Sequence, residues 1–148
     1  MKLSIIASLL LFFLMSCAGK SEKVESMSQS VNNTPVDAVT SFKKAMHEKD
    51  SVTIENLIAN SAKGEIVRRI NSNGGFKTYF HDMDSLHTDL TITGTKTDST
   101  LSSISKVMVK WHSSTQGSAE KVTDSVYMIT VKEDGGWKLT SLYPQYEF

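Results

Sequence analysis

Residues 126–139 read VYMITVKEDGGWKL and contain the clearest β-hairpin pattern of the chain. Side chains alternate in character on both sides of Asp134-Gly135-Gly136, and a glycine-rich turn between two alternating runs is typical of antiparallel strands. The same alternation, with Gln116-Gly117 as a further turn signal, predicts four strands in all. They are expected at residues 87–96, 101–113, 122–133 and 137–143. Because these strands follow one another directly, we expect an antiparallel meander.

A helix pattern comes before the strands. Thr34 can accept a backbone hydrogen bond at a helix start, Pro35 suits the first helical position, and Asp37 has the spacing of a capping box. Apolar residues then recur at steps of three and four positions, which places them on one face. The sequence therefore predicts a helix over residues 35–47.

Two shorter helices are expected next. Asp50 is positioned to cap a short helix that carries Ile54 and Leu57, and a third helix around residues 66–70 ends at Asn73-Gly74-Gly75. Residues 76–86 receive no assignment from the pattern. Helices followed by a meander indicate an α+β domain, in which N-terminal helices pack on a curved antiparallel four-stranded sheet.

The first 16 residues have the pattern of a secretory leader. Lys2 gives a positive start, and residues 3–15 are apolar except for Ser4 and Ser8. Thirteen helical residues span roughly 20 Å, which is shorter than the roughly 30 Å hydrocarbon core of a bilayer. The pattern therefore favours a cleaved signal peptide over a permanent membrane span.

Leu14-Met15-Ser16-Cys17 resembles the lipobox of bacterial lipoproteins. The resemblance implies that the Cys17 thiol receives diacylglycerol, that cleavage falls between Ser16 and Cys17, and that the new amine is acylated. Two or three acyl chains are enough for stable attachment, whereas one chain binds only marginally. Because residue 18 is Ala rather than Asp, the resemblance also implies release to the outer membrane of a Gram-negative cell envelope.

Composition limits what the mature chain contains. The full chain has 16 Lys+Arg and 16 Asp+Glu, and removal of the leader takes away Lys2 and no acid. A net charge of −1 gives no basic footprint, so nucleic-acid binding is not expected. Cys17 is the single cysteine, which excludes disulfides and thiolate chemistry from the domain. Residues 17–34 lack aromatic side chains and are interpreted as a tether, followed by one domain at 35–148.

Two segments resemble the nuclear-transport-factor-2-like, cystatin-like superfamily. The first runs from Thr34-Pro35-Val36-Asp37 through Glu48-Lys49-Asp50 to Leu57 and is similar to the opening helix pair of that superfamily. The second, residues 131–139, is similar to the last hairpin of small lipoproteins that carry a domain of unknown function. The resemblance implies a cone, in which a strongly curved sheet surrounds the first helix. Its members include isomerases and dehydratases as well as binding and accessory modules.

His81-Asp82-Met83-Asp84 and His87 form the densest cluster of possible metal ligands. Imidazole and carboxylate groups bind zinc, and three of them would leave a position open for water. Loops rich in these residues are also common where nothing binds. We interpret this cluster as a solvated loop, and we predict neither a metal site nor a cofactor site.

The strand pattern gives little support for catalysis. Alternation predicts an inward face that is mainly aliphatic, with Tyr127 as its hydrogen-bond donor, and it places Asp124, His112 and Lys110 on the opposite face. A buried acid or base with a shifted pKa is what proton-transfer enzymes require. Trp111, Tyr127 and Trp137 either fill the core or line an apolar pocket.

These observations favour a non-catalytic binding or accessory module of the cell envelope, held to the membrane by acyl chains on Cys17. Its partner would be a small apolar molecule or an envelope protein. The alternatives are a lyase or isomerase of the cone fold and a purely structural protein. The aromatic tail at residues 143–148 either folds back on the sheet edge or contacts a partner.

Labelling with radioactive palmitate in growing cells tests the lipid anchor. The chain should take up label, and Cys17→Ser should lose all of it because the acceptor thiol is gone. Ser16→Ala, which keeps a small residue at the cleavage site, is the matched control and should remain labelled. Label that persists in Cys17→Ser, or a mature N-terminus upstream of Cys17, would contradict the assignment.

Overall fold

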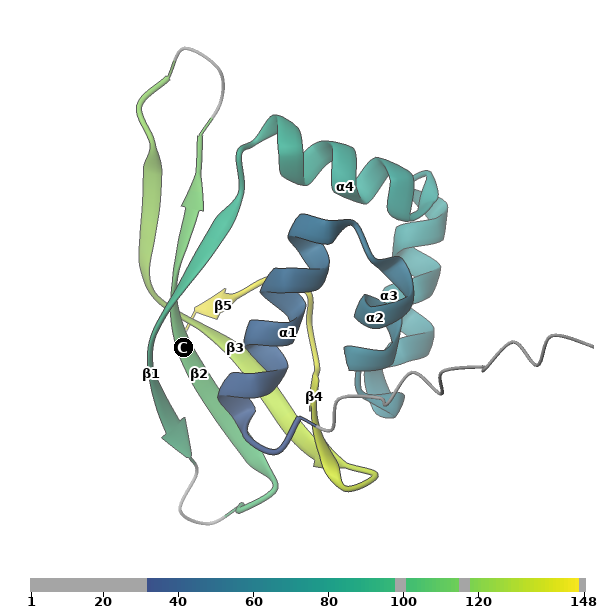
Figure 1. The fold of residues 1–148 in the computed structure, drawn as a ribbon, viewed down its shortest axis with the longest axis vertical. Helices are drawn as coiled ribbons and strands as arrows, with labels where there is room; N and C mark the ends of the chain where they lie inside the picture. The colour runs from purple at the N-terminus through teal and green to yellow at the C-terminus, as the bar shows by residue number, and fades with distance from the viewer. Residues whose placement is uncertain (1–31, 98–100, 115–117, 147–148) are drawn as a thin grey trace, which may run out of the picture.

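The computed structural model describes residues 32–97, 101–114 and 118–146. These residues form four helices followed by five strands (Figure 1). The helices are α1 (Pro35–Glu48), α2 (Ser51–Leu57), α3 (Asn60–Ser72) and α4 (Gly75–Ser85). The strands are β1 (Asp89–Thr97), β2 (Ile104–Ser113), β3 (Lys121–Glu133), β4 (Gly136–Leu139) and β5 (Gln145–Tyr146). The predicted α+β class is confirmed.

The start of α1 has the geometry that its sequence predicts. The backbone N–H of Asp37 donates to Thr34 Oγ1 at 3.1 Å, and the N–H of Thr34 donates to Asp37 Oδ2 at 2.9 Å. These two bonds form a capping box, which satisfies donors that a helix leaves open at its first turn. Asp50 likewise caps α2 by accepting from the N–H of Thr53 at 3.0 Å. The hydroxyl and the backbone N–H of Thr53 lower the pKa of Asp50.

The sheet is antiparallel, in the order β1-β2-β3-β4, with β5 also paired to β3. Asp134 and Gly135 have φ values of 51° and 79° in the turn between β3 and β4, as the glycine-rich signal predicts. The predicted turn at Gln116-Gly117 lies outside the described residues. Four predicted strands are one too few, because β5 pairs only at two positions and is too short to show alternation.

Helix α1 covers the inner face of the sheet. Figure 1 shows α1 between the sheet on one side and α2 and α3 on the other. Phe42 of α1 is fully buried and belongs to one core cluster with Val107 of β2 and Met128 of β3. The backbone N–H of Ala59 donates to the carbonyl oxygen of Leu139 at 2.8 Å, which joins the end of α2 to β4. Among the described residues, no helix has the length and apolar character needed to cross a bilayer.

A β-bulge reverses the alternation predicted for β3. Val109 pairs with Val126 and Trp111 pairs with Thr123, so β3 advances three residues where β2 advances two. One extra residue moves all later side chains to the other face. Val126, Met128 and Thr130 are therefore the buried residues of β3. The predicted inward residues were Thr123, Ser125, Tyr127, Ile129 and Val131. The inward position predicted for Tyr127 is wrong.

Residues 76–86, which the pattern left unassigned, lie mostly in α4. Gly74 precedes the helix and Gly75 is its first residue, with φ values of 94° and 79°, a backbone conformation that glycine adopts without strain. A Cβ atom on Gly74 would also lie 2.4 Å from Thr78 Oγ1, closer than such atoms approach. The predicted end of α3 at Asn73-Gly74-Gly75 is confirmed, and the same glycines begin the next helix.

Candidate functional site

Helix α4 presents a row of aromatic rings to the rest of the domain. Phe76, Tyr79 and Phe80 are spaced three and four residues apart, so they share one face of the helix. Phe76 and Tyr79 meet edge to face with ring centroids 6.1 Å apart, and Tyr79 and Phe80 do so at 5.6 Å. This arrangement is one that aromatic pairs prefer.

Two rings from distant parts of the sequence complete the group. Tyr143, in the segment between β4 and β5, lies 6.0 Å from the ring of Tyr79 and 6.4 Å from the ring of Trp111 on β2. We refer to Phe76, Tyr79, Phe80, Trp111 and Tyr143 as the aromatic cluster. It joins one helix, one strand and the C-terminal segment, and it is the candidate site.

The hydroxyl group of Tyr79 is the unusual feature of this cluster. Tyr79 is only 6% exposed, and its hydroxyl has no hydrogen-bond partner among the described residues, a condition shared with the Ser105 hydroxyl. Burial raises the pKa of Tyr79 well above its ordinary value, and the electrostatic interaction with Tyr143 raises it further. A buried polar group without a partner costs about 1–3 kcal/mol, so most such groups in proteins are paired.

Tyr143 covers this region from the solvent side. Its side chain is half-buried and the residue is 48% exposed. Burial raises the pKa of Tyr143, and the negative charge of Asp82 on α4 raises it as well. The residue is held locally, because its N–H donates to Ser141 Oγ at 3.1 Å and its carbonyl oxygen accepts from the same hydroxyl at 2.9 Å.

The aromatic cluster therefore combines flat apolar walls with one buried hydroxyl. Aromatic walls favour flat apolar ligands, and a single convergent polar group fixes their orientation. The five residues of the cluster include no Asp, Glu, His, Lys or Arg, and the carboxylate of Asp82 lies near its outer edge.

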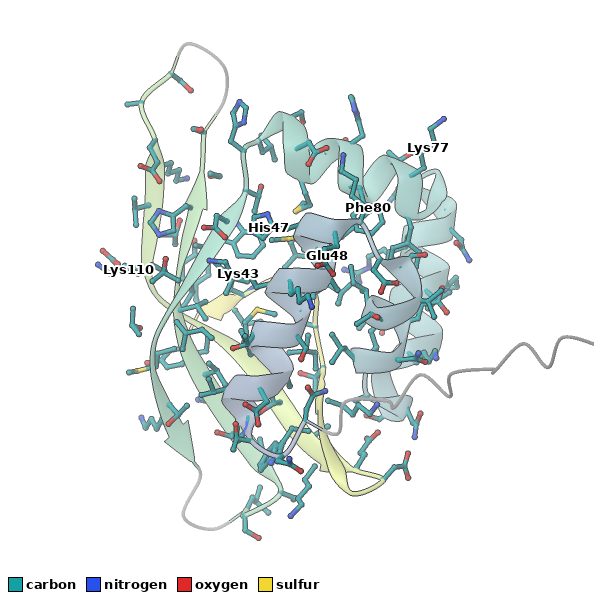
Figure 2. All side chains as sticks on the ribbon, viewed as in Figure 1. Lys43, His47, Glu48, Lys77, Phe80 and Lys110 are labelled. Carbon is teal, nitrogen blue, oxygen red and sulfur yellow. The ribbon has the colours of Figure 1, made fainter. Side chains whose placement is uncertain are left out.

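A second group of polar side chains links α1 to β1. Lys43 Nζ lies 3.1 Å from Asp89 Oδ1 and donates to the carbonyl oxygen of Leu90 at 2.8 Å, and His47 Nε2 lies 3.2 Å from Asp89 Oδ1. Figure 2 labels Lys43 and His47 on α1. Burial opposes ionisation of Asp89, but hydrogen bonds from the Leu90 backbone, Lys43 and His47 lower its pKa overall. These contacts join a helix to a strand, so we assign them a structural role.

The cluster of possible metal ligands, interpreted as a solvated loop, lies mostly on a helix. His81, Asp82 and Asp84 lie on α4 rather than in a loop, and His87 follows the helix with a φ value of 43°. All four are exposed, whereas Met83 between them is buried in the core. Within residues 32–97, 101–114 and 118–146, no three His, Cys, Asp or Glu side chains are grouped closely enough to hold a metal ion.

The three aromatic residues singled out in the strands do not meet. Trp111 belongs to the aromatic cluster, but Tyr127 lies on the outer face of the sheet with Lys106 Nζ 5.6 Å from its ring centroid. Trp137 is buried near the other end of β3, where its backbone N–H donates to the carbonyl oxygen of Asn32 at 2.9 Å. Trp111 is thus the one member of the set that lies at the site.

The three members of the aromatic cluster on α4 were missed from the sequence, and Tyr143 was singled out only as part of the aromatic tail. A signal existed for α4, because Phe76, Tyr79, Phe80 and Met83 follow the three- and four-residue spacing of a buried helix face. No local signal joins Tyr143 to that helix, because the contact spans about sixty residues of sequence. Of the two alternatives for the aromatic tail, the structure supports folding back on the sheet edge through β5.

Ser16 and Cys17 lie outside the described residues, so the lipid anchor stays a prediction. Comparison with known families finds no matching family model, and no curated protein sequence matches the chain. Among solved structures, the fold is similar to the solution structure of RPA3114, a SEC-C motif containing protein from Rhodopseudomonas palustris. The TM-score is 0.58 with 14% sequence identity, over 78% of this chain and 80% of that one. The likeness shows a shared fold.

Removal of the Tyr79 hydroxyl tests whether that group lacks a partner. Tyr79→Phe should leave the free energy of unfolding unchanged or raise it by up to about 1 kcal/mol, because no hydrogen bond is lost. Thr130→Val is the matched control, since Thr130 Oγ1 is equally buried but donates to the Ser105 carbonyl oxygen at 3.1 Å. That control should lose about 1 kcal/mol in urea unfolding. Equal losses in both variants would show that the Tyr79 hydroxyl is bonded.

Proposed function

We propose that this chain is a lipid-anchored binding module of the cell envelope and that it takes a small apolar molecule at the aromatic cluster. The observation that carries the proposal is the Tyr79 hydroxyl, which is buried with no partner among the described residues, on a ring that contacts three other aromatic rings. A ligand that bonds this hydroxyl would remove the cost of burying it.

The membrane part of the proposal rests on the sequence. A short apolar leader is followed directly by Ser16 and the single cysteine, Cys17. Acyl chains on Cys17 would hold the mature chain at the outer membrane, and the tether predicted at residues 17–34 would connect them to the domain. The first described residue, Asn32, is fixed to the domain, since its side-chain oxygen accepts from Ser41 Oγ at 2.8 Å.

The finer description of the fold also belongs to this proposal. We infer a cone of the nuclear-transport-factor-2-like type, in which the sheet curves around α1. Two features support it: α1 packs on the inner face of the sheet, and α4 lies beside the end where β1 begins (Figure 1). In such a cone the aromatic cluster would lie at the open end. A ligand would then enter between α4 and the C-terminal segment.

The buried polar side chains of the core are uncharged, which is consistent with a binding role. The buried polar side chains of the described residues belong to Asn32, Thr88, Ser105 and Thr130, in addition to the tyrosine hydroxyl of the cluster. None of these four side chains exchanges a proton near neutral pH. One of them, Thr130, fixes a backbone group, since its hydroxyl donates to the carbonyl oxygen of Ser105.

Binding of N-phenyl-1-naphthylamine tests this function. The dye is neutral and flat, and its fluorescence rises in apolar surroundings. The mature chain, residues 17–148 with Cys17→Ser, contains every residue of the core and avoids interference from the leader and lipid. We expect saturable binding, and Trp111→Ala should weaken it by about tenfold, the loss of one aromatic contact.

Tyr146→Ala is the control for this measurement. Tyr146 is 61% exposed in the same C-terminal region but is not part of the aromatic cluster, so its loss should not change dye affinity. Dye binding that fails to saturate, or that is equally weakened by Trp111→Ala and Tyr146→Ala, would contradict a site at the cluster.

A further inference from the structure

The ring of Tyr143 occupies the position that a ligand would need. It lies against Tyr79 with a ring-centroid distance of 6.0 Å and an interplanar angle of 74°, and against Trp111 at 6.4 Å and 58°. Tyr143 thus already fills the space between a helix residue and a strand residue with one six-membered aromatic ring. A flat ring of that size is the shape that the remaining walls accept.

Few contacts hold Tyr143 in this position. The preceding residue, Leu142, is buried, and Thr140 is fixed to β3 by two hydrogen bonds to the carbonyl oxygen of Ile129. Beyond Tyr143, and within the described residues up to 146, the chain pairs with β3 only through β5, at Val126 and Tyr127. The hydrogen bonds of Tyr143 itself are to Ser141, within the same segment, and would move with it. We therefore expect displacement of the ring to break its contacts with Tyr79 and Trp111 while Thr140 and Leu142 stay in place.

The polar groups define the chemistry of the replacement. Tyr79 offers a buried O–H that can donate one hydrogen bond, which calls for an acceptor on the ligand. The carboxylate of Asp82 acts on Tyr143 from α4, and this negative charge repels an anion placed there. A neutral carbonyl oxygen meets both conditions, whereas a carboxylate meets only the first.

On the basis of the proposed function, we infer that Tyr143 is a displaceable occupant of the aromatic cluster. Its ring gives way to a neutral aromatic carbonyl compound, whose flat ring lies between Tyr79 and Trp111 and whose carbonyl oxygen accepts a hydrogen bond from the Tyr79 hydroxyl. Binding is non-covalent, and the hydrogen bond that orients the ligand is made only when Tyr143 has moved away.

Three small probes test this inference. Acetophenone carries the neutral carbonyl, α-methylstyrene has the same shape with a CH₂ group in place of the oxygen, and benzoate is the anion. Each is titrated into the mature Cys17→Ser chain carrying Tyr143→Ala, and binding is followed by the NMR signal of the Trp111 indole N–H. Trp137 is the internal reference, because it pairs with Lys132 whereas Trp111 pairs with Thr123, roughly 30 Å along β3.

The expected result is a preference for the carbonyl. Tyr143→Ala should bind acetophenone about tenfold more tightly than α-methylstyrene, because the second probe leaves the buried hydroxyl unpaired. Benzoate should bind more weakly than acetophenone. The preference should disappear when Tyr79→Phe is added, and Tyr146→Ala should bind no better than the unmodified chain. The unmodified chain should show the same preference at lower affinity, which keeps the test informative if Tyr143→Ala does not fold.

Each contrary result has a distinct meaning. Equal affinity for acetophenone and α-methylstyrene, or a preference that survives Tyr79→Phe, would overturn the inferred carbonyl ligand while leaving an apolar site in place. Tightest binding of benzoate would overturn the neutral class. If the folded chain and its Tyr143→Ala variant bind none of the probes, the inference fails, whereas the proposed function fails only if the dye does not bind either.

Discussion

The sheet of this domain is longer than the helix that covers it, and the candidate site follows from that difference. Strand β3 has 13 residues and spans about 40 Å at the rise of a β-strand. Helix α1 has 14 residues and spans only about 21 Å. The apolar inner face of the sheet must nevertheless be shielded from water along its length. Elements other than α1 therefore cover the end near Trp111.

Helix α4 and the C-terminal segment provide that cover, and both do so with aromatic rings. Large rings cover this end of the sheet efficiently, since each buries a large area with few rotatable bonds. One of them, Tyr79, brings a hydroxyl that the described residues do not pair. A phenylalanine at this position would fill the same volume without that cost. The hydroxyl is explained if the cluster binds a molecule that supplies an acceptor.

The elements that local rules govern were predictable from the sequence. The cap at Thr34, the glycine turn after β3 and the apolar spacing of α1 are short-range features, and each is present as expected. The orientation of β3 was not, because the bulge opposite Val109 and Trp111 adds a residue that no local pattern marks. The aromatic cluster was also missed, since it depends on contacts of Tyr143 with residues far away in sequence.

The burial of the Tyr79 hydroxyl, on which the proposed site depends, can be measured directly. The ¹³Cζ resonance of Tyr79, followed by NMR in a ¹³C-tyrosine-labelled chain as the pH is raised, reports when this phenol loses its proton. Burial disfavours the phenolate, so Tyr79 should stay protonated well above the ordinary tyrosine pKa of 10.0. A Tyr79→Phe spectrum assigns the signal. A midpoint near pH 10.0 would place the hydroxyl in contact with water and contradict the account.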